Sequence, residues 1–152
     1  MIIIGLDPGI ARTGFGIIDT SAPNQYVRCG CITTPEHLSP EERLQILGDD
    51  LTNLIRQYQP DQAVVEQLFF GANAKTAIIV AQARGVILYV LQQYNIPITS
   101  LTPLQIKSRL SGYGAASKEQ IQTLVTKLLN LSAVPQPDDA ADALAAALSI
   151  TH

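Results

Sequence analysis

Four acidic residues in this chain lie where a carboxylate is unusual, inside otherwise apolar sequence. Asp7 ends the run MIIIGLD, and Glu66 ends the run AVVE. Asp139 and Asp142 stand three positions apart in the alanine-rich segment DDAADALAAAL, so they would share one face of a helix. A buried carboxylate is costly unless a cation or a metal ion compensates its charge. No lysine or arginine follows Lys127, so the last two acids have no basic partner nearby in the sequence.

These four acids are suited to bind divalent metal ions. Hard cations such as Mg²⁺ prefer oxygen ligands and are usually held by a few carboxylates together with water and substrate phosphates. Convergent carboxylates without His or Cys fit a two-metal site for phosphodiester hydrolysis, in which one ion lowers the pKa of the attacking water and the other stabilises the leaving oxygen. We therefore predict that the catalytic and metal-binding residues are Asp7, Glu66, Asp139 and Asp142.

Each acid also has a simpler interpretation, which the sequence alone leaves open. Asp7 precedes a Pro-Gly pair and could open a turn, and Glu66 could be an edge residue at the end of a strand. Asp138 is best explained as the N-cap of the last helix, where the helix dipole favours a negative charge, and we exclude it from the predicted site. Asp139 could share that capping role, whereas Asp142 lies past the first turn and is the hardest to explain in this way.

The pattern of apolar residues and helix caps predicts the elements that position these acids. Short β-branched runs predict strands, and two of them end at Asp7 and Glu66. The segment Ser39–Glu42 is typical of a helix start with a capping box and a proline in the first turn, and similar patterns stand at Thr102 and Ser117. The predicted fold is α/β, a mixed sheet with helices on its faces. In order, we expect a strand at 1–7, a turn at 8–14, strands at 15–20 and 26–33, a helix at 39–58, a strand at 60–67, a helix at 73–94, a strand at 96–101, and helices that begin at 102, 117 and 138 or 139.

Length and composition favour one globular domain over residues 1–152, with no membrane partner. Apolar residues make up 47% of the chain, which argues against disorder, and no apolar run approaches the roughly 20 residues of a membrane span. The N-terminus has no basic leader, so we expect no signal peptide. Cys29 and Cys31 alternate along a predicted strand, where they would not form a good disulfide. A reducing, cytoplasmic location is therefore the simplest expectation.

The charge is distributed unevenly along the chain. The net charge of −3 argues against a nucleic-acid partner at first sight. However, residues 67–137 contain six basic side chains and one acidic side chain, whereas residues 1–66 contain four basic and nine acidic ones. The middle of the chain could thus form a surface that faces phosphates. Chance segregation of ordinary surface lysines is the alternative explanation.

Taken together, four segments of this chain resemble the motifs of the RuvC family of bacterial Holliday junction resolvases, which have a ribonuclease H-like fold. They follow the family's order and separations, and they agree with the predicted order of strands and helices. The resemblance covers nearly the whole chain and implies a mixed five-stranded sheet flanked by helices on both faces. The segments are GLDPGIARTGFGII, VVEQLFFGANAKTA, AQARGV and DDAADALAAAL.

The resemblance also implies an activity and its partners. RuvC-like proteins are homodimeric, Mg²⁺-dependent endodeoxyribonucleases that make paired nicks in opposed strands of a four-way DNA junction during homologous recombination and DNA repair. For this chain it implies two Mg²⁺ ions per active site, replaceable by Mn²⁺, and the branch-migration proteins RuvA and RuvB as partners. The family's four acids match Asp7, Glu66, Asp139 and Asp142, whereas Asp138 precedes the family pattern.

Three more residues match positions that the family uses for DNA. Phe69 stands where the family has an aromatic residue that engages the junction, and Lys107 and Lys118 match lysines implicated in DNA contact and catalysis. Phe69 and Phe70 cannot both point inward on one strand, so one of them could be exposed and stack on a base; Phe70 itself has no assigned role. Ordinary solvated lysines and packed phenylalanines are the alternatives. The segment NAKTAIIVAQARG corresponds to the helix that pairs across the family's dimer.

This sequence departs from the family pattern in two respects, and three other interpretations of its function compete with the resemblance. Family members often carry a basic tail beyond the last motif, whereas this sequence ends at His152 and has a pI of about 5.2, so we expect weaker DNA affinity. The first alternative is another ribonuclease H-like nuclease, such as a YqgF-type RNA-processing protein. The second is a sugar-kinase or actin-like nucleotide-binding domain, which would need a second such domain. The third is a DNA-binding scaffold without catalysis, which the four acids argue against.

Overall fold

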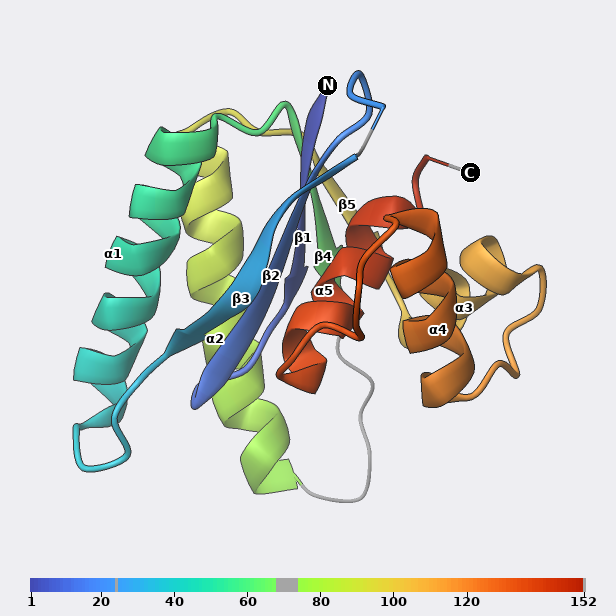
Figure 1. Ribbon diagram of the computed structural model, residues 1–152. Helices are drawn as coiled ribbons and strands as arrows, with labels where there is room; N and C mark the ends of the chain where they lie inside the picture. Colours follow the sequence, from blue (N-terminus) through green and yellow to red (C-terminus); the bar gives the residue numbers. More distant parts are fainter. Residues whose placement is uncertain (24, 68–73, 152) are drawn as a thin grey trace.

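The computed structural model describes residues 1–23, 25–67 and 74–151, and the predicted order of strands and helices is confirmed (Figure 1). Three strands open the chain, two more alternate with helices, and three helices close it. The elements are β1 (Ile2–Asp7), β2 (Arg12–Asp19), β3 (Tyr26–Thr33), α1 (Pro40–Tyr58), β4 (Gln62–Glu66), α2 (Ala74–Gln93), β5 (Ile98–Leu101), α3 (Pro103–Ser111), α4 (Lys118–Leu128) and α5 (Asp138–Leu148).

The strands form a mixed five-stranded sheet in the order β3-β2-β1-β4-β5. β1, β2 and β3 are antiparallel neighbours, whereas β4 runs parallel to β1 and β5 runs parallel to β4. The β1–β4 register pairs Leu6 with Val65. The next residues, Asp7 and Glu66, therefore end neighbouring strands at the same edge of the sheet.

The turn between β1 and β2 is shorter than predicted. β2 begins at Arg12, not at Phe15, so the predicted turn at 8–14 was too long. The hydroxyl of Thr13 donates a hydrogen bond to the carbonyl oxygen of Gly9 over 2.6 Å, which closes the turn early. Gly9 leaves room for this closure, because a Cβ there would lie 2.2 Å from the carbonyl oxygen of Arg12.

Helices cover both faces of the sheet (Figure 1). α1 and α2 pack on one face over a core that includes Leu6 of β1 and Val65 of β4, and α5, with α3 and α4 beside it, packs on the other. Side chains alternate between the two faces along each strand. The three predicted N-caps Ser39, Thr102 and Ser117 all form complete capping boxes. These three helices thus begin where the local sequence indicates.

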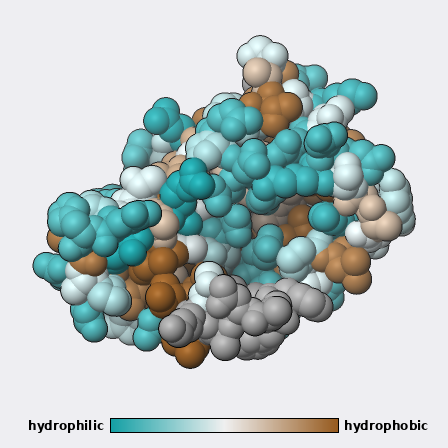
Figure 2. Space-filling model, turned by 90° about the horizontal axis from the view of Figure 1, so that it is seen from below, coloured by the Kyte–Doolittle hydropathy of each residue, from teal (hydrophilic) through white to brown (hydrophobic). Residues whose placement is uncertain are grey.

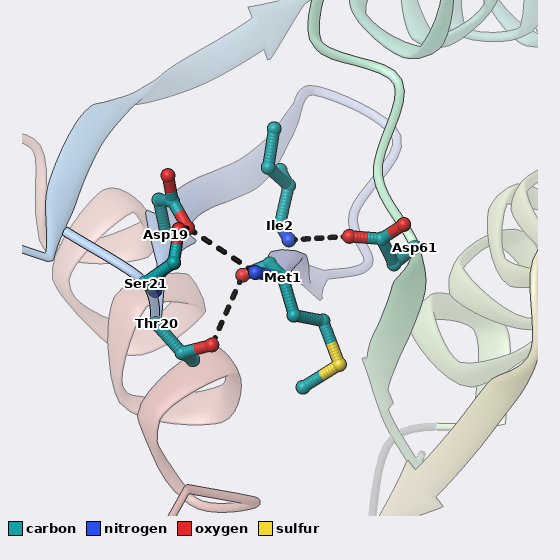
Figure 3. Close-up of polar contacts among 6 residues, drawn as sticks. All are labelled: Met1, Ile2, Asp19, Thr20, Ser21 and Asp61. Carbon is teal, nitrogen blue, oxygen red and sulfur yellow. Dashed lines mark hydrogen bonds and ion pairs between the residues drawn. The ribbon is translucent and has the colours of Figure 1, made fainter.

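Polar contacts fix the start of β1 between two loops (Figure 3). The ammonium group of Met1 lies 3.3 Å from the carboxylate of Asp19, and the hydroxyl of Thr20 donates to the carbonyl oxygen of Met1. On the other side, the backbone N–H of Ile2 donates to the carboxylate of Asp61 over 2.6 Å. These contacts anchor the end of β1 that lies opposite Asp7.

α2 is a long apolar helix that the described part of the chain covers only partly. Its segment Thr76–Gln93 is long and apolar enough to cross a membrane by length and composition alone, although 22% of it is buried inside the structure. Ile78 is 62% exposed and Tyr89 is 64% exposed. Figure 2 shows apolar side chains gathered in patches between hydrophilic regions when the molecule is viewed from below. α2 therefore presents apolar side chains that residues 1–23, 25–67 and 74–151 leave exposed.

Candidate active site

Asp7 and Glu66 point to the same face of the sheet, the one that α5 covers. In β1, the alternation places Ile4 and Leu6 in the core beneath α1 and α2, whereas Gly5 touches the backbone of α5. Asp7, two residues after Gly5, shares its face. Both acids are half-buried. The predicted strand-end acids are thus neighbours under one helix.

α5 approaches the sheet so closely that backbone meets backbone. A Cβ on Gly14 of β2 would lie 2.0 Å from the carbonyl oxygen of Asp139, and one on Gly16 would lie 2.6 Å from the backbone nitrogen of Leu144. Gly14 also pairs directly with Asp7 in the antiparallel register. Gly14 is therefore the point at which the strand that carries Asp7 and the helix that carries Asp139 and Asp142 come together.

Two cations from elsewhere in the chain contact the acids of α5. The Lys118 ammonium, at the start of α4, lies 3.1 Å from Asp142 Oδ2 and 3.1 Å from Asp138 Oδ2. The Arg12 guanidinium, at the start of β2, lies 3.5 Å from Asp139 Oδ2. Sequence reasoning missed the role of Arg12. Its only signal was that it stands in the same glycine-containing turn as Asp7.

The prediction that Asp138 caps α5 was wrong. Pro137 is the N-cap residue, no side chain caps the helix, and Asp138 is the first helical residue. The Asp138 carboxylate instead binds Lys118 and accepts a hydrogen bond from the Gln122 amide over 3.3 Å. The side chain points across to α4 because opposite charge lies there and the backbone has already entered the helix.

Burial and the charges of neighbouring acids raise the pKa values of Asp7, Glu66 and Asp142. Burial, together with the charges of Glu66, Asp142 and Asp139, raises the pKa of Asp7 to about 8. Burial, together with the charge of Asp142 and against the opposing charges of Lys107 and Lys118, raises the pKa of Glu66 to about 7. The pKa of Asp142 is also raised by burial, against the opposing effect of Lys118. The site is therefore short of positive charge.

A pocket of about 200 Å³ opens beside Glu66 and Asp142. Lys107 and Lys118 line it together with apolar side chains of α3, α4 and α5. Both lysines predicted from the family motifs thus face the acids. The carboxyl ends of β1 and β4 point toward the face seen in Figure 2, where hydrophilic side chains surround a hollow.

The acids influence one another's pKa values, but among the described residues they are not grouped closely enough to coordinate one metal ion as they stand. Among the residues that the structure describes, no three His, Cys, Asp or Glu side chains are grouped to hold a metal ion as they stand. Two of the four acids instead hold the chain's own cations, Lys118 and Arg12. The donor set nevertheless fits a hard divalent ion, because it consists of carboxylate oxygens, and the raised pKa values of Asp7 and Glu66 indicate that counter-charge is missing there.

The remaining sequence predictions concern two phenylalanines and two cysteines. Phe69, predicted to contact DNA, and its neighbour Phe70 lie outside the described residues. Cys29 and Cys31 are free thiols, as expected. Cys31 pairs with Gly14 across the sheet, and burial, assisted by the charge of Asp139, raises the pKa of its thiol to about 11. A thiol with such a pKa stays protonated and is a weak ligand.

Comparison with known proteins agrees with this geometry. The family model described as crossover junction endodeoxyribonuclease RuvC matches residues 3–152. The RuvC of Fusobacterium nucleatum is 51% identical over all of this chain and 80% of that protein, and the RuvC of Roseiflexus sp. is 49% identical over 98% of this chain and 89% of that protein. The structure of Thermus thermophilus RuvC in complex with a Holliday junction substrate is 28% identical, with a TM-score of 0.91 over 98% of this chain and 92% of that chain.

These matches cover the strands that carry Asp7 and Glu66 and the helix that carries Asp139 and Asp142. They also confirm the predicted ribonuclease H-like fold. Sequence, fold and site thus lead to one conclusion: the chain belongs to the RuvC family of crossover junction endodeoxyribonucleases.

Proposed function

We propose that this chain is a structure-selective endodeoxyribonuclease that resolves four-way DNA junctions by paired, symmetric nicks in homologous recombination and DNA repair. The observation that carries the proposal is the set of four acids at the ends of β1 and β4 and on α5, in a chain that matches the RuvC model over residues 3–152. The similarity to a RuvC structure that holds a Holliday junction supports the same substrate here.

The proposed catalytic residues are Asp7, Glu66, Asp139 and Asp142, which would hold two Mg²⁺ ions, or Mn²⁺ in their place. Bound ions of this kind lower the pKa of an attacking water and stabilise the leaving oxygen of the phosphodiester. The chain's own part is to release the protons that Asp7, and Glu66 in part, retain near neutral pH, since only ionised carboxylates bind the ions. The raised pKa values of these two acids support this role.

Lys118 and Arg12 act as counterions in this proposal. Their contacts with Asp142 and Asp139 compensate charge in the metal-free protein, and both side chains are about half exposed, at 49% and 56%, so they can swing toward phosphates. Lys107, which lines the pocket, neutralises phosphate beside Glu66. Phe69 is proposed to stack on a base near the exchange point.

A homodimer provides the two cuts. A four-way junction is two-fold symmetric, and two equivalent sites on one dimer match that symmetry. The exposed apolar side chains of α2, such as Ile78 and Tyr89, suit a contact between subunits. We further infer that the protein acts in the cytoplasm together with RuvA and RuvB, which would deliver the junction.

The test compares a synthetic four-way junction, a linear duplex and an RNA–DNA hybrid as substrates with Mg²⁺. We expect paired nicks in the junction alone. Asp7→Asn, Glu66→Gln, Asp139→Asn and Asp142→Asn should each abolish nicking and leave junction binding intact. Preferential cleavage of the hybrid would favour a different ribonuclease H-like nuclease, and full activity in any one variant would remove that residue from the site.

A further inference from the structure

One motif residue has no part in the function proposed above. Arg84, from the segment AQARGV, lies on α2 and is half-buried. Its Nε donates a hydrogen bond to the backbone carbonyl oxygen of Glu66 over 3.3 Å, and its Nη2 donates to the hydroxyl of Ser100 over 2.8 Å. One guanidinium group therefore joins α2 to the end of β4 and to β5.

The position of this contact matters because Glu66 is the last residue of β4. On the β5 side, Glu66 pairs with Leu101, and the backbone N–H of Gln67 donates to the carbonyl oxygen of Leu101 over 2.8 Å. On the α2 side, Arg84 binds the Glu66 carbonyl itself. A planar guanidinium presents its donors in a fixed fork, so these two bonds define the orientation of the peptide that carries the Glu66 side chain.

Arg84 acts on the backbone and does not compensate carboxylate charge. Within the described parts of the chain, the ion pairs of the acidic site are made by Arg12 and Lys118, and Arg84 makes none with a carboxylate. The cations that lower the pKa of Glu66 against burial and the charge of Asp142 are Lys107 and Lys118. The contribution of Arg84 is therefore one of geometry.

We propose that Arg84 is a positioning residue that holds the Glu66 carboxylate in place for metal binding by fixing the end of β4 to α2. The inference rests on the proposed function, since it takes Glu66 as a metal ligand. α2 also carries the exposed apolar side chains proposed to contact the second subunit. Arg84 thus lies on the same helix as the proposed subunit contact.

The experiment measures Mn²⁺ binding to the metal-free full-length protein by isothermal titration calorimetry, without DNA. Residues that orient a metal ligand typically contribute about 10–100-fold to metal affinity, and we expect a loss of this size for Arg84→Gln. Arg84→Lys should recover part of the affinity, because an ammonium can still donate to the Glu66 carbonyl. Ser100→Ala should cause a smaller loss, because it removes one of the two anchors and leaves Arg84 in place.

Arg56→Gln is the matched control. Arg56 also donates from its Nε, here to the hydroxyl of Tyr94 over 2.9 Å. Tyr94 directly follows α2, so this bond joins α1 to the end of α2 that lies away from the acids. Its loss should lower the unfolding temperature without changing Mn²⁺ affinity. Junction binding in the absence of metal should be the same for all four variants, since none removes a proposed DNA contact.

Several outcomes would overturn the inference, and they are distinguishable. If Glu66→Gln loses Mn²⁺ affinity but Arg84→Gln and Ser100→Ala do not, Arg84 does not position Glu66 and the proposed function stands. If Glu66→Gln keeps full affinity, the proposed function itself fails. Weaker metal-free junction binding by Arg84→Gln would make Arg84 a DNA contact. If Arg84→Gln does not fold, Ser100→Ala decides, and unchanged affinity in that variant refutes the inference.

Discussion

Gly14→Ala should disable the active site although it adds only one methyl group. The added Cβ would lie 2.0 Å from the carbonyl oxygen of Asp139, and the next nearest atom, the Asp139 carbonyl carbon, would be 2.5 Å away. Such contacts are at least about 3.0 Å long in folded proteins, so α5 and β2 must separate by about 1 Å. Gly14 pairs with Asp7, so this separation moves the acids of β1 and α5 apart.

The expected magnitude follows from that displacement. A misplacement of about 1 Å can cost on the order of 10²-fold in rate, and overpacking of this kind costs roughly 1–3 kcal/mol of stability. Single-turnover nicking of a four-way junction at saturating Mg²⁺ measures the first quantity, and thermal unfolding measures the second. Junction affinity should change little, because the backbone of Gly14 lies beneath α5.

Two further glycine variants test the reasoning. Gly16→Ala also meets α5, at 2.6 Å from the backbone nitrogen of Leu144, but one turn beyond Asp139, so it should destabilise the protein with a smaller loss of rate. Gly48→Ala on α1 meets side-chain carbons, one of Val86 at 3.3 Å and one of Val90 at 3.9 Å. It should leave nicking unchanged and stabilise the helix by up to about 1 kcal/mol. Wild-type nicking by Gly14→Ala would refute the idea that close backbone packing sets the distance between the acids.

Three other predictions concern charge. Lys118→Ala should slow nicking by at least about tenfold, as expected for loss of a positioned charge at a reacting phosphate. It should not weaken Mn²⁺ binding in calorimetry, and weaker Mn²⁺ binding would contradict the role of Lys118 as a counterion. Asp138→Asn should nick at close to the wild-type rate, because Lys118 keeps its contact with Asp142; inactivity in the same assay would place Asp138 in the site. The metal-free protein should lose thermal stability as pH rises from about 4 to about 8, because the folded state keeps the Asp7 proton up to a pKa of about 8 while the unfolded state releases it near 3.8. Asp7→Asn should flatten this dependence of the unfolding temperature on pH, and Mg²⁺ should stabilise the protein more at pH 8 than at pH 5. An unfolding temperature that rises with pH would contradict the assignment.

Local sequence was sufficient for the elements that depend on neighbours along the chain. The caps at Ser39, Thr102 and Ser117 combine a hydroxyl with a Glu or Gln three residues later, and all three form as predicted. The ends of β1 and β4 at Asp7 and Glu66 follow from short apolar runs. Each of these features is determined within a few residues, which is the range over which propensity and capping act.

The contacts that failed prediction join residues distant in the sequence. The cap expected at Asp138 gave way to an ion pair with Lys118, twenty positions earlier, and Arg12 meets Asp139 from the other end of the chain. Neither pair leaves a periodic or spacing signal. Charge along the sequence showed that the last acids lack basic neighbours, but only the packing of α4 and β2 against α5 shows which cations compensate them.

The close approach of α5 has its cause on both sides of the contact. On the helix side, the small alanine side chains of α5 let this helix press against the sheet. The structure adds that the opposing positions on the strands are glycines, with Gly14 under Asp139 and Gly16 under Leu144. Because the nearest atoms of α5 to these two glycines are backbone atoms, which cannot move as a flexible side chain can, the distance between the acids of β1 and α5 is set by backbone contact. A methyl group at Gly14 should for this reason be as damaging to catalysis as a change to a supporting residue such as Arg84, although neither variant removes a carboxylate.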